Sequence, residues 1–517
     1  MMNLKYNLKL FIAFFGILFF SACTDLEYEN LGGIIPEEGS VGESSELLAA
    51  AYGQLREFSN ERVIFGLSEH SADVVIGPTR GGDWFDGGVF QQMHLQDWTG
   101  DHLFIRTSWQ QLNAGLFLAT QAIEGTGATP QIIAEAKTVR AYFMFHILDF
   151  WGITTFREAT QGLEADPLVR NSAESATFII EDLESALPNL PATSNRNLAN
   201  KNTARALLCK LYLNKAVYNE EDRSVGRFTF DPADMAKVVE YADAITASGD
   251  YSLTPGLEGY FNTFAERNDV ESSELIFSVP GSQIPFFKAK WNCSLHWNQK
   301  PGGWSGFATL SDFYDTFDAD DSRIGGEYNS ATNPYTSSTG VKVGFMIGPQ
   351  FDETGAQVFA RDGVTPVNFT REVDLKINGE VEGIRILKYI PDFSGGVDNA
   401  DDPGNSYVLL RYGDVLVNKA EALFRSGDVA GAEAIINDLR EVRFGTPSPL
   451  ALTLETLLEA RGREIYWEGW RRNDLVRFGK FLDEWQEKPA TTSEKVLFPL
   501  PTTALLANPG LSQNPGY

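Results

Sequence analysis

The segment RGREIYWEGWRRNDLVRFGKFLDEW, residues 461–485, combines charged and aromatic side chains at an unusual density. Its charges fall in an order that stabilises a helix, because Glu468 precedes Arg472 by four residues and Asp474 precedes Arg477 by three. Such charges also form ion pairs with neighbouring elements. We therefore expect residues 461–485 to form a helix that a network of ion pairs holds against the rest of a helical scaffold.

A helical hairpin precedes this segment. Residues 415–443, VLVNKAEALFRSGDVAGAEAIINDLREVR, have small and apolar residues at helical spacing on both sides of a turn at Gly427 and Asp428. This arrangement resembles a tetratricopeptide-type hairpin. The same Gly-Asp ending recurs at Gly249 and Asp250, after another amphipathic stretch. Such degenerate repetition predicts an irregular scaffold of paired helices and not a regular solenoid.

Further helices are predicted in the first half of the chain. Each segment has apolar residues at three-and-four spacing, begins near Ser, Asn or Asp, and ends near Gly or Pro. The segments are 44–58, 103–124, 130–152, 172–190, 202–218 and 232–250. Inside them, four residues are expected to be buried in the core: Trp109, His146, Trp151 and Cys209.

The middle of the chain has a different composition. Gly, Pro, Asn, Ser and aromatic residues become frequent, and short candidate strands occur at 274–280, 341–347 and 384–390. The predicted fold is therefore mainly α, with a large loop-rich and partly β insertion in a helical scaffold. The predicted parts are a scaffold at 43–250 with an aromatic loop at 70–100, a loop-rich, ligand-facing region at 251–407, and a scaffold at 408–517.

The N-terminus resembles that of a bacterial lipoprotein. Lys5 precedes an apolar run at residues 10–20, which is too short to cross about 30 Å of hydrocarbon but suits a signal peptide. Small residues then precede Cys23, as in a lipoprotein cleavage site whose cysteine becomes acylated. We predict a signal peptide at 1–22 and a lipidated tether at 23–42. An ordinary secretory signal is the alternative.

Charge and missing motifs exclude several classes of function. The formal net charge of −28 offers no electrostatic footprint for nucleic acid. The motifs HExxH and GxSxG and the P-loop are absent, and the five histidines lack metal-ligand spacing on any one helix. We therefore predict no catalytic residue, no metal and no cofactor. A surface glycoside hydrolase stays open, because its two facing carboxylates need no sequence motif.

Two C-terminal segments closely resemble the signature of the SusD/RagB family. They are residues 461–485 and the closing stretch LFPLPTTALLANPGLSQNPGY, residues 497–517. The matching residues are Arg463, Glu464, Trp467, Glu468, Gly469, Arg472, Asp474, Leu475, Arg477, Gly479, Pro499, Pro501, Asn508, Pro509, Asn514, Pro515 and Tyr517. Together with the lipoprotein-like start, the tetratricopeptide-like hairpin and the loop RGGDW at residues 80–84, the resemblance covers essentially the whole mature chain.

The resemblance implies both a fold and a role. Members of this family are lipid-anchored glycan-binding partners of SusC-like TonB-dependent transporters. It implies about four tetratricopeptide-like helix pairs, a position on the outer surface of the outer membrane, and delivery of oligosaccharide to the transporter without catalysis. The alternatives are a glycoside hydrolase, a tetratricopeptide adaptor for proteins, and a family member that captures peptides or other non-sugar nutrients.

Two aromatic clusters in loops are candidates for the glycan site. Sugars present C–H faces that pack on rings, while their hydroxyl groups bond to polar side chains at the edges. The segment SADVVIGPTRGGDWFDGG, residues 71–88, contributes Asp73, Arg80, Asp83 and Trp84. The segment KWNCSLHWNQKPGGWSGF, residues 290–307, contributes Trp291, His296, Trp297 and Trp304. Burial under its own loop, or at the transporter interface, is the alternative for each ring.

Overall fold

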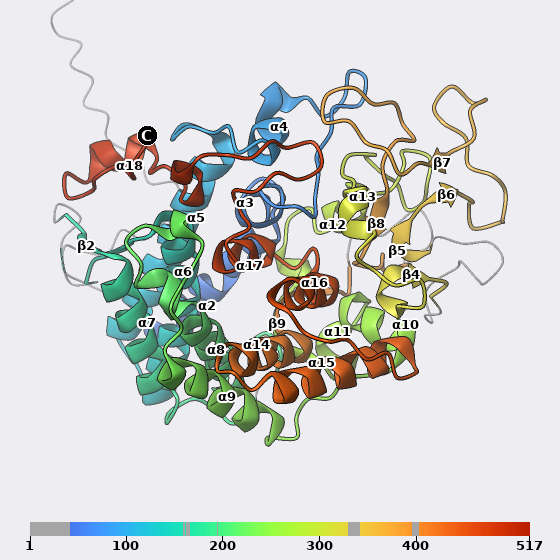
Figure 1. The fold of residues 1–517 in the computed structure, drawn as a ribbon. Helices are drawn as coiled ribbons and strands as arrows, with labels where there is room; N and C mark the ends of the chain where they lie inside the picture. Colours follow the sequence, from blue (N-terminus) through green and yellow to red (C-terminus); the bar gives the residue numbers. More distant parts are fainter. Residues whose placement is uncertain (1–41, 159–160, 162–165, 194, 329–341, 395–402) are drawn as a thin grey trace, which may run out of the picture. The chain divides into compact units, whose positions relative to one another are not determined.

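The computed structural model describes residues 42–158, 161, 166–193, 195–328, 342–394 and 403–517 (Figure 1). The predicted signal peptide, Cys23 and most of the predicted tether lie outside these residues. Within the described residues the chain is mainly helical, as predicted. No helix among them is both long enough and apolar enough to cross a bilayer.

The helices of the first half begin and end where their capping residues stand. Asn171 and Asn200 each complete a capping box at a helix start, and Gly152 ends a helix in left-handed backbone with φ of 73°. The elements are α2 (Ser44–Gln54), α3 (Ile64–Glu69), α4 (Val89–His94), α5 (Leu103–Glu124), α6 (Pro130–Trp151), β1 (Thr154–Phe156), β2 (Leu168–Arg170), α7 (Ser172–Ala186), α8 (Lys201–Tyr218) and α9 (Pro232–Thr246). The six predicted segments are confirmed as α2 and α5 to α9.

The C-terminal helices continue the series. They are α14 (Tyr412–Arg425), α15 (Val429–Phe444), α16 (Leu454–Ile465), α17 (Arg471–Arg477) and α18 (Thr502–Ala507). The predicted hairpin is confirmed as α14 and α15, with Asp428 capping α15. Each helix from α5 to α9 packs on the next, α9 packs on α14, and α14 packs on α15 and α16 (Figure 1, lower left and bottom). The two ends of the chain therefore build one helical layer.

The region between α9 and α14 leaves and rejoins the helices through an antiparallel ladder. In it β3 pairs with β9, so that Val279 lies opposite Tyr407. A second sheet joins β5 to β4 and β8. The elements are α10 (Gly256–Phe261), α11 (Asn268–Glu271), β3 (Leu275–Pro280), α12 (Ala289–Asn292), α13 (Ser311–Tyr314), β4 (Gly325–Gly326), β5 (Val343–Met346), β6 (Gly348–Pro349), β7 (Asn368–Phe369), β8 (Arg385–Leu387) and β9 (Ser406–Arg411). The three predicted strands are confirmed as β3, β5 and β8.

The charged segment at 461–485 is not one helix, contrary to our expectation. It is divided into α16 and α17, because Trp467 and Gly469 between them have φ of 57° and 84°, outside the right-handed helical region. The Trp467 indole is buried and donates from Nε1 to the carbonyl oxygen of Val74 at 2.9 Å. A long-range contact thus holds the chain in a conformation that helical propensity disfavours.

The predicted pairing of Glu468 with Arg472 is wrong for the same reason. Glu468 instead accepts from Arg411 Nε at 2.7 Å and from Lys388 Nζ at 2.6 Å. Arg472 pairs with Asp149 of α6 at 2.9 Å. The general expectation of ion pairs to neighbouring elements is confirmed, but the partners lie far away in the sequence.

A second group of buried charges joins α14, α16 and α17. Glu421 accepts two bonds from Arg477 at 2.8 Å each and one from Arg425 at 2.7 Å, and Arg461 Nε lies 3.3 Å away. Asp474 completes the group through Arg461 at 2.9 Å and Arg477 at 2.6 Å. The predicted pair of Asp474 and Arg477 is therefore confirmed. Removing one member of such a buried group leaves an uncompensated charge.

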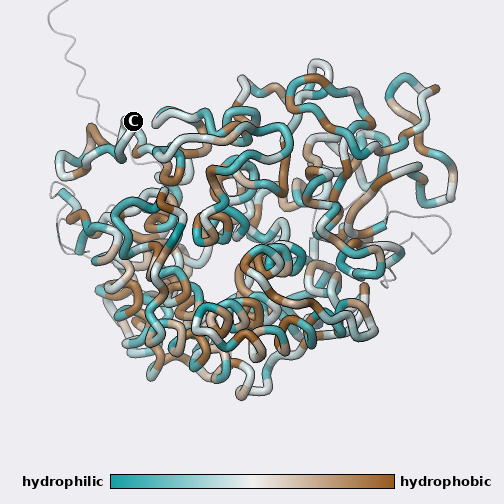
Figure 2. The backbone as a smooth tube through the Cα atoms, in the orientation of Figure 1, coloured by the Kyte–Doolittle hydropathy of each residue, from teal (hydrophilic) through white to brown (hydrophobic). Residues whose placement is uncertain are grey.

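Apolar side chains fill the space between these elements. Figure 2 shows hydrophobic and hydrophilic residues alternating around the helical turns at lower left, where α6 to α9 lie. Trp109, His146, Trp151 and Cys209 are all buried, as predicted. The core extends from the helices into the strand region through one continuous cluster of buried residues. The loops between them are consequently carried on a rigid support.

Candidate functional site

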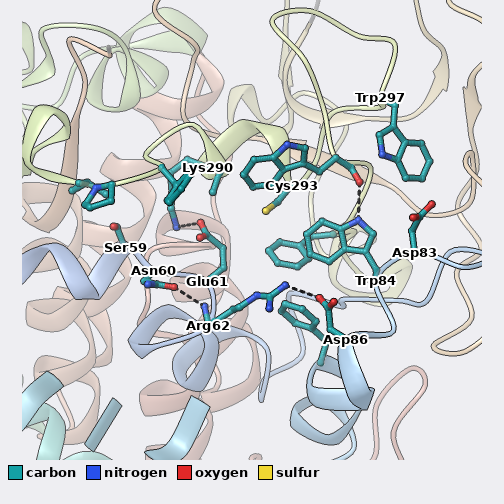
Figure 3. Close-up of a pocket in the computed structure, with 17 residues that line it drawn as sticks. Ser59, Asn60, Glu61, Arg62, Asp83, Trp84, Asp86, Lys290, Cys293 and Trp297 are labelled. Carbon is teal, nitrogen blue, oxygen red and sulfur yellow. Dashed lines mark hydrogen bonds and ion pairs between the residues drawn. The ribbon is translucent and has the colours of Figure 1, made fainter. Parts of the chain in front are cut away.

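A cavity of about 440 Å³ lies among loops from three parts of the chain (Figure 3). We call it the indole cavity, because three tryptophans line it. The residues that line it are Ser59, Asn60, Glu61, Arg62, Asp83, Trp84, Asp86, Phe90, Ile284, Pro285, Phe286, Ala289, Lys290, Cys293, Trp297, Trp304 and Phe307. The first half supplies the segments before α3 and α4, and the insertion supplies α12 with its flanking loops.

Trp84 is held from several sides. Its Nε1 donates to the carbonyl oxygen of Trp304 at 2.7 Å, and its ring meets Phe307 edge-on with centroids 5.1 Å apart. A Cβ on Gly306 would come within 2.4 Å of the Trp84 ring, so the indole occupies space that only glycine leaves free. The side chain is half-buried. Its orientation is therefore fixed by the protein alone.

Trp297 is covered by an arginine from the insertion. The guanidinium carbon of Arg361 lies 3.7 Å from the centroid of the Trp297 ring. The same guanidinium bonds to Asp83 at 3.0 Å and to Glu380 at 2.8 Å, and Glu380 lies 3.0 Å from His296 Nε2. Burial alone would raise the pKa of Glu380, but hydrogen bonds from Arg361 and His296 bring it below its usual value. The glutamate is therefore ionised and holds the arginine in place.

The remaining wall combines ion pairs with an exposed ring. Arg62 pairs with Asp86 at 2.6 Å, and Lys290 pairs with Glu61 at 2.7 Å (Figure 3). Phe286 keeps 73% of its surface exposed, which is high for an aromatic side chain. Rings thus lie beside charged and polar edges.

The structure brings four of the eight predicted site residues together. Asp83, Trp84, Trp297 and Trp304 all line the indole cavity, although the two predicted clusters are about 200 residues apart in the sequence. Hydrogen bonds from the Trp84 indole to the backbone of Trp304 and from Arg80 to the backbone of Gly306 link the clusters directly. The structure thus joins the two clusters into one candidate site.

The other four predicted residues do not line the cavity. Asp73 accepts two bonds of 2.7 Å from Arg471. Arg80 is buried and donates to three backbone carbonyls, and burial lowers its pKa to about 9. Trp291 and His296 are fully buried. These four side chains support the loops from within, and the site proposed below does not include them.

Several residues of the site were not among our predictions. Arg361 carries no local signal, because its partner Asp83 is 278 residues away in the sequence. Arg62 and Lys290 likewise become site residues only through folding. Phe286 offered a signal, since it follows a proline in a loop-rich segment and has no helical or strand pattern around it.

The side chains that line the indole cavity offer aromatic surface and hydrogen-bonding groups. Cys293 lines the cavity, but burial raises the pKa of its thiol well above the usual value, so it is not an activated nucleophile. Cys209 and Cys293 are both free and buried. Among the described residues, no group of three or more His, Cys, Asp or Glu side chains is arranged to hold a metal ion.

Comparisons with known proteins place the chain among relatives of one kind. Residues 288–517 match the model of the SusD family. The starch-binding protein SusD of Bacteroides thetaiotaomicron is 25% identical over 418 residues, covering 74% of this chain and 72% of that protein. SusD-like protein P38 of Formosa agariphila is 24% identical and covers 95% of both chains.

Solved structures share the fold. Surface glycan-binding protein A from Bacteroides fluxus superposes with a TM-score of 0.67 at 21% identity, covering 92% of this chain and 99% of that one. Surface glycan-binding protein A from Bacteroides thetaiotaomicron, in complex with laminarihexaose, gives a TM-score of 0.66 at 17% identity, covering 91% of this chain and 98% of that one. The resemblance of the C-terminal segments is thereby confirmed: residues 288–517 match the SusD family model, and the curated relatives are SusD and SusD-like proteins.

Proposed function

We propose that this chain is a cell-surface protein that binds oligosaccharides and delivers them to a SusC-like TonB-dependent transporter, over which it acts as a lid. The cavity in which Trp84, Trp297 and Trp304 lie together carries this proposal. The relatives support the ligand class, since one is named a starch-binding protein and one solved structure holds laminarihexaose.

The cavity suits a sugar chain for physical reasons. Indole rings offer flat apolar surface to the C–H faces of pyranose rings, and a ring already held in place loses little conformational entropy on binding. Asp83 and Asp86 can accept hydrogen bonds from hydroxyl groups, and Asn60 can both donate and accept. The combination favours a polyhydroxylated, partly apolar ligand.

We propose that the site binds the glycan without cleaving its glycosidic bonds. Glycoside hydrolysis needs one carboxylic acid that donates a proton and a second carboxylate facing it. The carboxylates that line the indole cavity are instead each paired with a cation: Glu61 with Lys290, Asp83 with Arg361 and Asp86 with Arg62. A carboxylate held by a cation in this way is positioned to accept hydrogen bonds from hydroxyl groups.

The anchor and the partner belong to the same proposal. Acylation of Cys23, which lies outside the described residues, would tether the protein to the outer face of the outer membrane. The helical layer of α5 to α9 with α14 to α16 would remain as a rigid frame while the loops of the indole cavity meet the ligand.

Titration calorimetry with neutral oligosaccharides such as laminarihexaose and maltoheptaose tests the proposal. The change Trp297→Ala is expected to lower the affinity about tenfold, or roughly 1.4 kcal/mol. The melting temperature should change little, because the ring is half-exposed. Phe351→Ala, which removes a ring of 42% exposure outside the indole cavity, is the matched control. A folded protein that binds no glycan, or a Trp297→Ala variant with unchanged affinity, would contradict the proposal.

A further inference from the structure

We propose that the indole cavity accepts uncharged oligosaccharides and selects against chains that carry uronate or sulfate groups, a conclusion that rests on the proposed function. The first observation is that the cations at this site are already paired. Arg62 meets Asp86 at 2.6 Å, and Lys290 meets Glu61 at 2.7 Å. These are the lysine and arginine side chains that line the cavity in the described structure.

Arg361, which covers Trp297 from outside the lining, is held even more firmly. Its Nε bonds to Glu380 at 2.8 Å, its backbone amide to the other oxygen of Glu380 at 2.9 Å, and its terminal nitrogen to Asp83 at 3.0 Å. Its plane also rests over the indole. An anionic ligand would have to share Arg361 with these two carboxylates, which already offset its charge.

The balance of charge at the site is negative. The carboxylates Glu61, Asp83, Asp86 and Glu380 outnumber the cations Arg62, Lys290 and Arg361 by one. Asp83 and Asp86 are the most accessible of these carboxylates, with side chains 45% and 35% exposed, beside Arg361 and Arg62 at 48% each. Like charges brought together at a partly desolvated site repel each other. The protein as a whole adds to this field, with a formal net charge of −28.

Neutral sugars meet no such obstacle. A carboxylate that is already paired keeps lone pairs free to accept bonds from hydroxyl groups, so Asp83 and Asp86 can serve the ligand without losing their cations. Specificity of this kind comes from repulsion of the wrong ligand as much as from attraction of the right one. The ion pairs thus contribute to ligand selectivity as well as to local stability.

The test is calorimetry or affinity electrophoresis at low ionic strength with two matched panels. The neutral panel holds laminarihexaose, cellohexaose, xylohexaose and maltoheptaose. The anionic panel holds oligogalacturonates, alginate oligomers and sulfated galactan oligosaccharides. We expect measurable affinity in the neutral panel alone. An anionic oligosaccharide that binds about tenfold tighter than every neutral one, and is released by salt, would overturn the inference while leaving glycan binding intact. The absence of binding in both panels would instead overturn the proposed function, and the inference with it.

Two variants locate the selectivity. Asp86→Asn removes the partner of Arg62, and asparagine tolerates the positive φ of 45° found at this residue. The ratio of anionic to neutral affinity should rise about fivefold in this variant, because the loss of the Asp86 charge favours anionic chains, while neutral chains lose one hydrogen-bond acceptor. Glu455→Gln on α16 removes the same charge from an exposed position away from the cavity and should have no effect. Equal gains in both variants would show that net charge alone sets the preference, which would overturn the role of the local ion pairs.

Discussion

The guanidinium group of Arg361 lies over the Trp297 indole, with its central carbon 3.7 Å from the ring centroid. Because Asp83 and Glu380 fix the guanidinium at 3.0 and 2.8 Å, the ring is supported on one face by a group that cannot easily move. One face of Trp297 is thus committed to the protein. Any ligand that stacks on this indole must use the remaining surface.

The change Arg361→Lys tests whether this support matters for binding. Lysine keeps the charge but has no planar fork to bond with both carboxylates and cover the ring. A cation–π contact at a partly exposed site contributes about 0.5–1 kcal/mol, so we expect affinity for neutral oligosaccharides to fall about two- to fivefold. Calorimetry with the best neutral ligand measures the change.

A matched control for this variant exists in the chain. Arg371 pairs with Asp315 at 2.6 Å and lies 5.4 Å from the Tyr314 ring centroid, and it does not line the indole cavity. Arg371→Lys makes the same chemical change at a similarly exposed ion pair. Equal affinity in Arg361→Lys and the wild-type protein would show that Trp297 needs no support from Arg361.

Gly306→Ala is expected to displace Trp84. The new Cβ would lie 2.4–2.7 Å from three atoms of the indole, closer than atoms can approach. Overpacking of this kind costs about 1–3 kcal/mol of stability. Since the ring lines the indole cavity, oligosaccharide affinity should fall together with the melting temperature. Gly82→Ala is the control, because a Cβ there meets no atom within 4 Å and the residue lies two positions from Trp84. A Gly306→Ala variant that binds normally would show that Trp84 can move without consequence.

Much of the helical frame was predictable because its signals are local. Capping residues such as Asn171 and Asn200 mark helix starts, and the apolar spacing between caps marks the buried faces. The break between α16 and α17 was not predictable. It depends on the positive φ of Trp467, which is maintained by burial of its ring and a bond to Val74 nearly 400 residues away.

The candidate site was likewise predictable only in part. Aromatic residues in glycine-rich loops pointed to Trp84, Trp297 and Trp304, and the structure places all three at one cavity. Composition did not separate these rings from Trp291, which is fully buried a few residues away. That distinction depends on which side of the loop faces the core, and a single sequence does not contain this information.

Glu421→Gln is expected to destabilise the fold strongly. Glu421 is fully buried and has three arginines within 3.3 Å, so its loss leaves Asp474 as the remaining carboxylate partner of Arg461 and Arg477. Breaking a buried pair costs about 3–5 kcal/mol. Chemical denaturation measures the loss. The control is Glu459→Gln on α16. Glu459 pairs with Arg463 at 3.3 Å, but its side chain is 38% exposed, so this pair should contribute less than about 1 kcal/mol to stability. Similar losses in the two variants would contradict a special role for the buried group.

Glu69 gives the protein a pH dependence that can be isolated. Its side chain is fully buried and accepts from the backbone amides of Gly469 and Trp470 at 2.6 and 2.9 Å, beside the break between α16 and α17. Burial raises the pKa of this carboxyl to about 8, above its value in the unfolded chain. The folded state therefore holds a proton that the unfolded state releases above about pH 4.5, so the stabilising contribution is complete at low pH and is lost as the pH rises toward 8.

Glu69→Gln removes this titration while keeping an oxygen that accepts from the same two amides. The free energy of unfolding of the wild-type protein should contain a component that falls by up to about 1.4 kcal/mol per pH unit between pH 5 and pH 8. In the variant this component should vanish, so the difference in stability between variant and wild type should grow in favour of the variant across that interval. Urea denaturation at a series of pH values measures both curves. Parallel curves would mean that the pKa of Glu69 is the same in the folded and unfolded chains. The hydrogen bonds from the Gly469 and Trp470 amides would then fully compensate the effect of burial on this pKa.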